Sequence, residues 1–142
     1  TLVFVGYGDN KYLSNRILKE DIKRCKVYGP AFGKLKNIVL SNANAFILPS
    51  FSEGLPSSVL EAMKAKLPTI ISSNCNITKV FKIKAALRGE PKVDSLKESL
   101  DSLMTMHKKE LNQIATNGFN FVSENFSWED VMNQLISLYS SF

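Results

Sequence analysis

The segment 45–66 constrains the fold more than any other part of this 142-residue chain. It begins with a short apolar run, Ala45–Leu48, of the kind found in strands that are covered on both faces of a sheet. Pro49 ends the run, and Pro56 is placed for the first turn of a helix, where its missing N–H does no harm. The segment therefore predicts a buried strand, a tight loop and a helix over 56–66.

Two carboxylates accompany this strand-loop-helix pattern. Glu53 lies in the loop, and Glu61 lies eight residues later, in the predicted helix. Two helical turns return to nearly the same angular position, so Glu61 should point along the helix face that begins at the loop. The N–H groups near Gly54 and Leu55, at the helix start, favour anions or sugar oxygens. Taken alone, such a pair also fits two solvated glutamates at an ordinary turn.

Strands and helices alternate along the chain, which predicts an α/β fold with a doubly wound parallel sheet. Ligands of such sheets bind beyond the carboxyl ends of the strands. We expect three loops of unusual composition to open on one edge and form a ligand site: Gly6–Gly8, Ser50–Glu53 and Ser73–Asn76.

Hydrophobic periodicity and turn residues set the expected elements. The expected strands cover 2–5, 26–29, 45–48, 69–72 and 85–87, and the expected helices cover 11–24, 34–41, 56–66, 77–82, 95–104, 107–125 and 127 to near 139. In the first helix Leu13, Ile17 and Leu18 should face inward. At the last helix Phe126 and Val131 are placed for a hydrophobic staple, with Asp130 as a capping acid.

Composition indicates one compact cytosolic domain over residues 1–142. The 44% hydrophobic content can fill a core, and no apolar run is long enough to span a membrane. Cys25 and Cys75 are fifty residues apart with no paired Cys or His nearby, so we expect two reduced, partly buried thiols and no metal.

The positive charge is concentrated near the start of the chain. Residues 1–36 hold eight Lys and Arg against three acids, which equals the whole net charge of +5. This excess could attract nucleotide phosphates or an anionic membrane surface. Nucleic acid is not expected as a partner, because no binding motif is evident. Solvated helix faces around Lys19, Lys23 and Arg24 explain most of these residues equally well.

The motifs resemble the second domain of the retaining GT-B glycosyltransferases of family 4. The matching residues are Pro49-Ser50, the run Glu53-Gly54-Leu55-Pro56 and the run Leu60-Glu61-Ala62-Met63. The resemblance runs from the first strand to the last helix, whose entry Phe126-Ser127-Trp128 also fits, with Trp128 as a structural anchor. It implies the C-terminal, Rossmann-like half of a GT-B fold with extra C-terminal helices.

The resemblance assigns roles to individual residues. Glu53 would be the catalytic residue that holds hydroxyls of the transferred sugar, helped by the amides of Gly54 and Leu55. Glu61 would accept hydrogen bonds from the two ribose hydroxyls, because a carboxylate has an oxygen for each. The remaining donor-binding residues would be Gly6 and Gly8, which let a nucleotide approach the backbone, Tyr28, at the strand end beside the nucleobase, and Asn76, facing the donor phosphates.

The sequence departs from the family pattern at a few positions. Lys66 stands where a Gly is usual, which predicts a surface change. The loop that usually carries Gly-Gly and then Pro-Glu has Cys75-Asn76 and Thr78-Lys79 instead. Asn76 can still donate hydrogen bonds to a phosphate, whereas Lys79 replaces the usual glutamate and leaves the donor contacts of this loop open.

The resemblance implies a transferase that moves a hexose from a nucleotide-diphosphate sugar to a sugar, glycan or lipid-linked acceptor, in glycan or polysaccharide biosynthesis. No cofactor or metal is expected. The family's acceptor-binding domain, and an Arg and a Lys that bind the pyrophosphate, would precede Thr1. We therefore expect a fragment, a truncated copy or a split subunit that is inactive alone, in the cytoplasm or at the inner membrane face.

Other functions fit the same pocket. A non-catalytic nucleotide-binding module and a partner subunit of a split glycosyltransferase both remain open, and an epimerase of the same two-domain fold fits the glutamate pattern less well. A phosphorelay receiver domain is excluded, because it needs an acidic cluster at strand ends that here carry Gly, Pro and Ser.

Overall fold

The computed structural model describes residues 1–17, 19 and 21–141, without the side chains of Asp130 and Gln134. The expected inward position of Leu18 and the capping role of Asp130 therefore lie outside the described residues. The chain divides into two compact units, an N-terminal unit of Thr1–Ser41 and a C-terminal unit of Asn42–Phe142.

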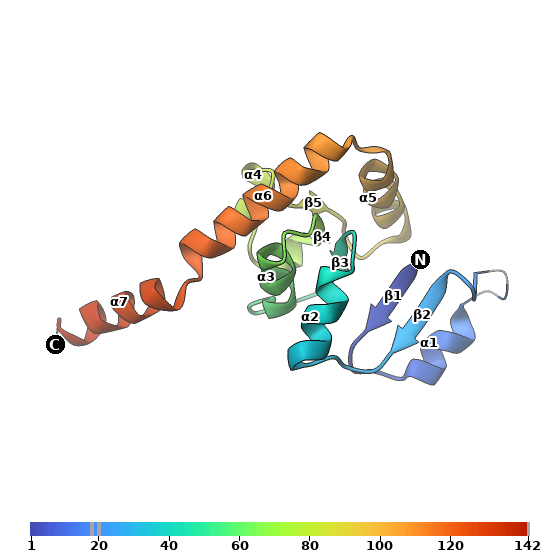
Figure 1. The fold of residues 1–142 in the computed structure, drawn as a ribbon, viewed down its shortest axis with the longest axis horizontal. Helices are drawn as coiled ribbons and strands as arrows, with labels where there is room; N and C mark the ends of the chain where they lie inside the picture. Colours follow the sequence, from blue (N-terminus) through green and yellow to red (C-terminus); the bar gives the residue numbers. More distant parts are fainter. Residues whose placement is uncertain (18, 20, 142) are drawn as a thin grey trace. The chain divides into compact units, whose positions relative to one another are not determined.

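The N-terminal unit is a two-stranded parallel sheet with two helices (Figure 1). Strands β1 (Leu2–Val5) and β2 (Cys25–Tyr28) pair from Leu2↔Cys25 to Val5↔Tyr28. Helix α1 (Asn10–Arg16) connects them and packs on β2, and α2 (Gly33–Ser41) follows. None of the described residues of this unit is buried, so the unit has no packed core among them.

The first helix is shorter than the sequence predicted. Helix α1 begins at Asn10, capped by the Asp9 carboxylate, which accepts from Tyr12 N at 2.8 Å, and it ends at Arg16. Ile17 is already extended, with φ −71° and ψ 125°. The predicted extension to Arg24 is wrong because an isolated helix is marginal in water and no residue of α1 gains a buried contact.

The C-terminal unit has a three-stranded parallel sheet of order β3-β4-β5, so the predicted α/β fold with parallel strands is confirmed (Figure 1). Helix α3 packs on β3, β4 and α6, and α5 packs on β5. The elements are β3 (Phe46–Leu48), α3 (Ser57–Lys64), β4 (Thr69–Ile71), a 3-10 turn η1 (Ser73–Cys75), α4 (Lys79–Lys82), β5 (Leu87–Arg88), α5 (Val93–Thr105), α6 (Lys108–Asn125) and α7 (Trp128–Tyr139).

The core of this unit lies between the sheet and helices α3, α4 and α6. Val59, Met63, Ile71 and Val80 are completely buried and contact one another in one cluster. Gly118 allows α6 to approach α3 closely, since a Cβ there would lie 3.1 Å from Met63 Cγ. This close packing fixes the sheet whose strand ends carry the candidate site.

Strand β3 differs from its prediction in burial, and strand β5 differs in where it begins. Strand β3 is half-buried, not covered on both faces, because it lies at one side of the three-stranded sheet. Strand β5 begins at Leu87, whereas the sequence predicted 85–87. Its position follows from pairing with β4, Ile70↔Leu87 and Ile71↔Arg88, and a partner's register cannot be read from local sequence.

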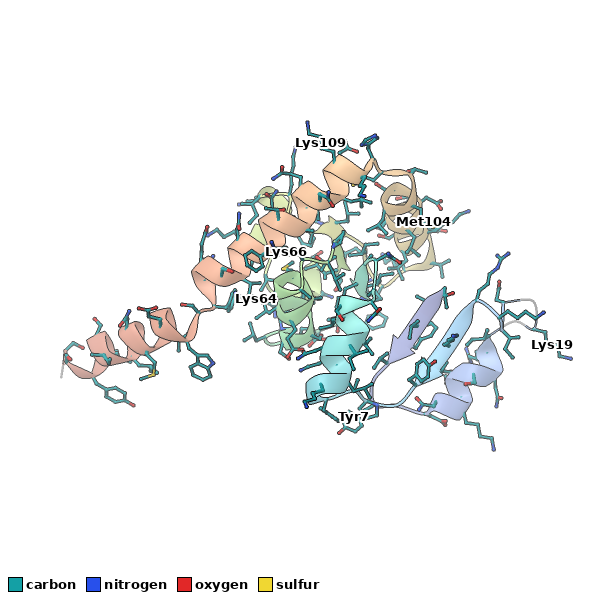
Figure 2. The ribbon with its side chains drawn as sticks, in the orientation of Figure 1. Tyr7, Lys19, Lys64, Lys66, Met104 and Lys109 are labelled. Carbon is teal, nitrogen blue, oxygen red and sulfur yellow. The ribbon has the colours of Figure 1, made fainter. Side chains whose placement is uncertain are left out.

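Helix α3 ends in a left-handed residue where the sequence has a lysine. Lys66 has φ +57° and closes a Schellman motif, in which Lys66 N donates to Met63 O at 2.9 Å and Leu67 N donates to Ala62 O at 3.1 Å. The Lys64 and Lys66 Nζ atoms lie 4.9 and 4.7 Å from the Phe119 ring centroid (Figure 2). The position usually held by Gly is therefore a helix end, and not only a surface change.

The two C-terminal helices differ in burial. His107 caps α6 through a capping box with Glu110, and five residues of α6 are buried. In contrast, every described large apolar side chain of α7 is exposed. Phe126 packs edge to face on Phe121 at 5.7 Å. Trp128 is 82% exposed, so the expectation that it anchors the helix is not met among the described residues.

Candidate functional site

A hollow of about 330 Å³ lies in the N-terminal unit, at the carboxyl ends of β1 and β2. Its lining includes Gly6, Gly8 and Tyr28, three of the residues that the sequence assigned to the donor, because parallel strands place Val5 and Tyr28 at the same edge. Gly8 has φ +149°, a conformation that a side chain disfavours, and the space beside its Cα is open. A ligand can therefore reach the backbone here.

Aromatic rings form much of this hollow. Tyr7, Tyr12 and Tyr28 line it and are exposed, and Tyr7 is labelled in Figure 2. The Tyr7 ring lies 6.0 Å from the Phe32 ring. Exposed aromatic faces can stack on a planar base. Tyr7 and Tyr12 were not predicted as site residues from the sequence, although Tyr7 stands between the predicted Gly6 and Gly8.

Glu53 lies in the C-terminal unit, in the loop between β3 and α3. Its side chain is half-buried, and its N–H donates to Asn74 O at 3.0 Å. The sequence predicted that the loops after β3 and β4 open on one edge, and this main-chain hydrogen bond joins them. The third predicted loop, Gly6–Gly8, belongs to the N-terminal unit.

The residues after Glu53 lead directly into α3. Gly54 and Leu55 are exposed, and the helix begins at Ser57 with Pro56 at its N-cap position. Pro56 O accepts from Val59 N at 2.9 Å. Glu61 is a half-buried residue of α3. The loop carboxylate, the helix start and the helix carboxylate thus occupy one continuous segment of the C-terminal unit.

Asn76 follows η1 in a left-handed conformation, with φ +57° and ψ 17°. Its Nδ2 donates to Glu53 O at 2.5 Å. The amide that the sequence analysis assigned to the donor phosphates thus has a partner in the protein. Asn76 and Glu53, two residues assigned to the donor separately, are in direct contact.

Cys75 and Lys79 are two of the residues that depart from the family pattern, and both lie close to other residues of the protein. Cys75 is completely buried, with its Sγ 3.8 Å from Leu48 O, and Cys25 is partly buried, so the prediction of two free, partly buried thiols is confirmed apart from the complete burial of Cys75. Lys79 begins α4, and its Nζ lies 6.0 Å from the Phe121 ring centroid.

The described residues contain no group of three or more His, Cys, Asp or Glu side chains that could hold a metal ion. No helix in the same part of the chain is both long enough and apolar enough to cross a lipid bilayer.

The parallel sheets, with glycine, aromatic, carboxylate and amide groups at their carboxyl ends, define a Rossmann-like α/β protein. The chain belongs to the family of glycosyl transferases group 1, whose family model matches residues 1–121. One curated relative, the O-antigen chain mannosyltransferase B of Escherichia coli, is 29% identical over 97 residues. Those residues are 68% of this chain and only 25% of the relative.

Solved structures show the same fold. Sucrose-phosphate synthase from Thermosynechococcus elongatus matches 99% of this chain and 38% of its own, with a TM-score of 0.83 and 19% identity. The C-terminal domain of a glycosyl transferase group 1 protein from Francisella tularensis matches 89% of this chain and 85% of its own, with a TM-score of 0.63 and 16% identity. The fold is therefore the Rossmann-like fold of GT-B glycosyltransferases.

Proposed function

We propose that this chain binds the nucleotide-diphosphate sugar of a retaining glycosyltransferase of the family 4 type, as part of a longer enzyme. The observation that carries the proposal is the continuous segment from Glu53 to Glu61, held at the carboxyl end of β3 by residues from the next loop. It combines a carboxylate for sugar hydroxyls, a helix start and a second carboxylate.

In the proposed reaction the bond from the anomeric carbon to the diphosphate breaks, and its electron pair stays on the diphosphate. The acceptor oxygen bonds to the same face of that carbon, and its proton passes to the departing diphosphate. Glu53 would hold hydroxyls of the transferred sugar, with the amides of Gly54 and Leu55 nearby. Charge that develops on the leaving group needs fixed donors, because electrostatic stabilisation is usually the largest contribution to catalysis.

We assign the nucleotide to two groups of residues. Glu61 would hold the ribose hydroxyls, and Gly6, Gly8 and Tyr28 would lie against the nucleotide. The glycines leave the backbone accessible, and the Tyr28 ring offers a flat surface. No cofactor is required, and the acceptor would be a sugar, glycan or lipid-linked sugar held by another domain, in polysaccharide biosynthesis at the inner membrane face.

Binding of free nucleotide tests the role of Glu61. Glu61→Ala should weaken binding of UDP or GDP about tenfold or more, because hydrogen bonds to a charged group are worth about 1.5–3 kcal/mol. Titration calorimetry on both proteins measures this. Glu98→Ala removes an exposed glutamate of α5 and should leave the affinity unchanged. Equal affinities for the Glu61→Ala variant and the wild type would exclude Glu61 from the site.

Turnover separates Glu53 from Glu61. In an enzyme that carries the acceptor domain, Glu53→Gln should lower kcat with little change in affinity for free nucleotide, since the contact is made mainly as transfer proceeds. The Escherichia coli relative is named a mannosyltransferase, so GDP-mannose belongs in the first set of donors. A variant with full turnover would remove Glu53 from the mechanism.

The 142-residue chain by itself should bind nucleotide but transfer no sugar. Orientation of the acceptor supplies much of the rate, and the matched part of sucrose-phosphate synthase is 38% of that protein. Radiolabelled UDP- and GDP-hexoses, incubated with the purified chain, test this expectation. Transfer by the chain alone would refute it, whereas nucleotide binding without transfer by any longer form would favour a non-catalytic module.

A further inference from the structure

The loop that carries Glu53 is held by side chains of the following loop. Residues 50–53 present four consecutive main-chain carbonyls, and each accepts a hydrogen bond from a side chain. The donors are Ser72 Oγ to Ser50 O at 2.5 Å, Asn74 Nδ2 to Phe51 O at 2.8 Å, Ser50 Oγ to Ser52 O at 3.1 Å and Asn76 Nδ2 to Glu53 O at 2.5 Å. Three of the four donors belong to residues 72–76.

Apolar packing does not hold this loop. The Phe51 side chain is 78% exposed, and Ser52 and Gly54 are exposed as well. A single exposed hydrogen bond contributes little to stability. Several such bonds on successive backbone groups, together with Glu53 N to Asn74 O at 3.0 Å, fix the direction in which the Glu53 side chain leaves the backbone.

Residues 72–76, which supply these donors, are themselves held by hydrogen bonds to the connection between β5 and α5. The Glu90 carboxylate accepts from both Ser73 N and Ser73 Oγ, and Glu90 N in turn donates to Ser95 Oγ at 3.0 Å. Beneath the loop, Cys75 is completely buried. The polar contacts therefore run from the β5–α5 connection through η1 to Glu53, entirely within the C-terminal unit.

We propose that Asn74 and Asn76 are positioning residues that aim the Glu53 carboxylate at the transferred sugar. The inference rests on the proposed function. Asn74 and Asn76 clamp the backbone on both sides of Ser52, and Asn76 does so from a left-handed conformation that asparagine tolerates better than most residues. Together they fix the backbone from which a catalytic carboxylate extends.

Substitutions that keep the backbone but remove the amide test the clamp. Asn76→Gly accepts φ +57° without strain, and Asn74→Ala removes the second amide. In an enzyme that carries the acceptor domain, each should lower kcat about 10- to 100-fold, since misplacement of a catalytic group by about 1 Å has effects of that size. Affinity of Asn74→Ala for free UDP and GDP should stay unchanged, and Asn112→Ala, an exposed asparagine of α6, should have no effect.

The readout is release of free sugar from GDP-mannose and UDP-glucose, which needs no known acceptor. In a Glu53→Gln background, Asn76→Gly should cause little further loss, because the clamp acts through Glu53. Turnover that falls with Glu53→Gln but not with Asn76→Gly would overturn the clamp and leave the proposed function standing. Turnover unaffected by Glu53→Gln would overturn the role of Glu53 and the positioning role with it.

Hydrogen exchange on the 142-residue chain tests the clamp without activity. The Glu53 amide should exchange faster in Asn76→Gly and Asn74→Ala than in the wild type, because the loop opens more often. Asn112→Ala should leave its exchange unchanged. Equal exchange in all four proteins would show that the two asparagines do not hold the loop.

Discussion

The two units have the same kind of secondary structure and opposite degrees of packing. Each is a small parallel sheet with its crossover helices, yet the C-terminal unit completely buries Val59, Met63 and Ile71, and the described N-terminal unit has no buried residue. Both present loops at the carboxyl ends of their strands. Strand pairing without buried residues can therefore place loops at one edge of a sheet, whereas only the C-terminal unit supports that edge with a core.

The largest expected difference between the units follows truncation of a packed side chain. Met63→Ala should lower the free energy of unfolding by about 2–5 kcal/mol, because it leaves a cavity in the core. Leu13→Ala, a matched helical truncation in the N-terminal unit, removes a half-buried side chain and should have an effect of about 1 kcal/mol. Urea denaturation followed by circular dichroism measures both. Equal losses would show that the N-terminal unit has a core of its own.

Replacement of a glycine by alanine in each unit should give the next largest difference in stability between the two units. A Cβ at Gly89 would lie 2.5 Å from Ile70 Cγ2, so Gly89→Ala should destabilise the protein by about 1–3 kcal/mol. Nothing lies within 4 Å of the corresponding position at Gly29, and Gly29→Ala should change stability by less than about 0.5 kcal/mol. Thermal unfolding of both variants measures this. A Gly89→Ala variant that is as stable as Gly29→Ala would contradict the difference in packing.

Substitutions at residues with positive φ should change the free energy of unfolding less, and in opposite directions in the two units. Lys66→Gly should stabilise the protein by up to about 1 kcal/mol, because its φ of +57° suits glycine. Gly33→Ala, at φ +50° in the N-terminal unit, should destabilise it by about as much. Lys66→Ala is the control, since it removes the contact with Phe119 but keeps the strained backbone. Similar stabilities for Lys66→Gly and Lys66→Ala would exclude backbone strain as the cause.

The smallest effect on stability is expected in α7. Ile136→Ser should change the free energy of unfolding by less than about 0.5 kcal/mol, because the side chain is 57% exposed. Ile114→Ser in α6, where the side chain is 8% exposed, is the matched control and should be strongly destabilising.

The same helix is expected to cause self-association of the chain, because its described apolar side chains, Trp128 and Tyr139 among them, are exposed. Ile136→Ser should reduce this association in sedimentation velocity runs at high protein concentration. A wild-type chain that stays strictly monomeric under those conditions would contradict the expectation.

The strand, loop and helix of segment 45–66 could be predicted from the sequence, because the residues that delimit them lie within the segment itself. Pro49 and Pro56 delimit the loop, so the predicted 45–48 and 56–66 lie close to the observed Phe46–Leu48 and Ser57–Lys64. The end of α1 could not be predicted, since it depends on packing that the N-terminal unit lacks. The start of β5 depends on the register of its partner strand.

The candidate site divides in the same way. The glutamates and glycines were identified because they stand beside predicted strand ends. The hydrogen bonds of Asn74 and Asn76 join residues more than twenty positions apart, so no local sequence pattern predicts them. Glu90 is seventeen positions from Ser73 and was missed for the same reason.

The exposure of α7 also has an evolutionary consequence. Selection for folding acts on α6, whose apolar side chains fill the core, and acts only weakly on α7, whose described apolar side chains fill nothing. Substitutions along α7 should accumulate freely among homologous sequences if folding alone constrains them. Where the spacing of Trp128, Val131 and Leu135 is retained across distant homologues, a requirement other than the stability of this chain has retained it.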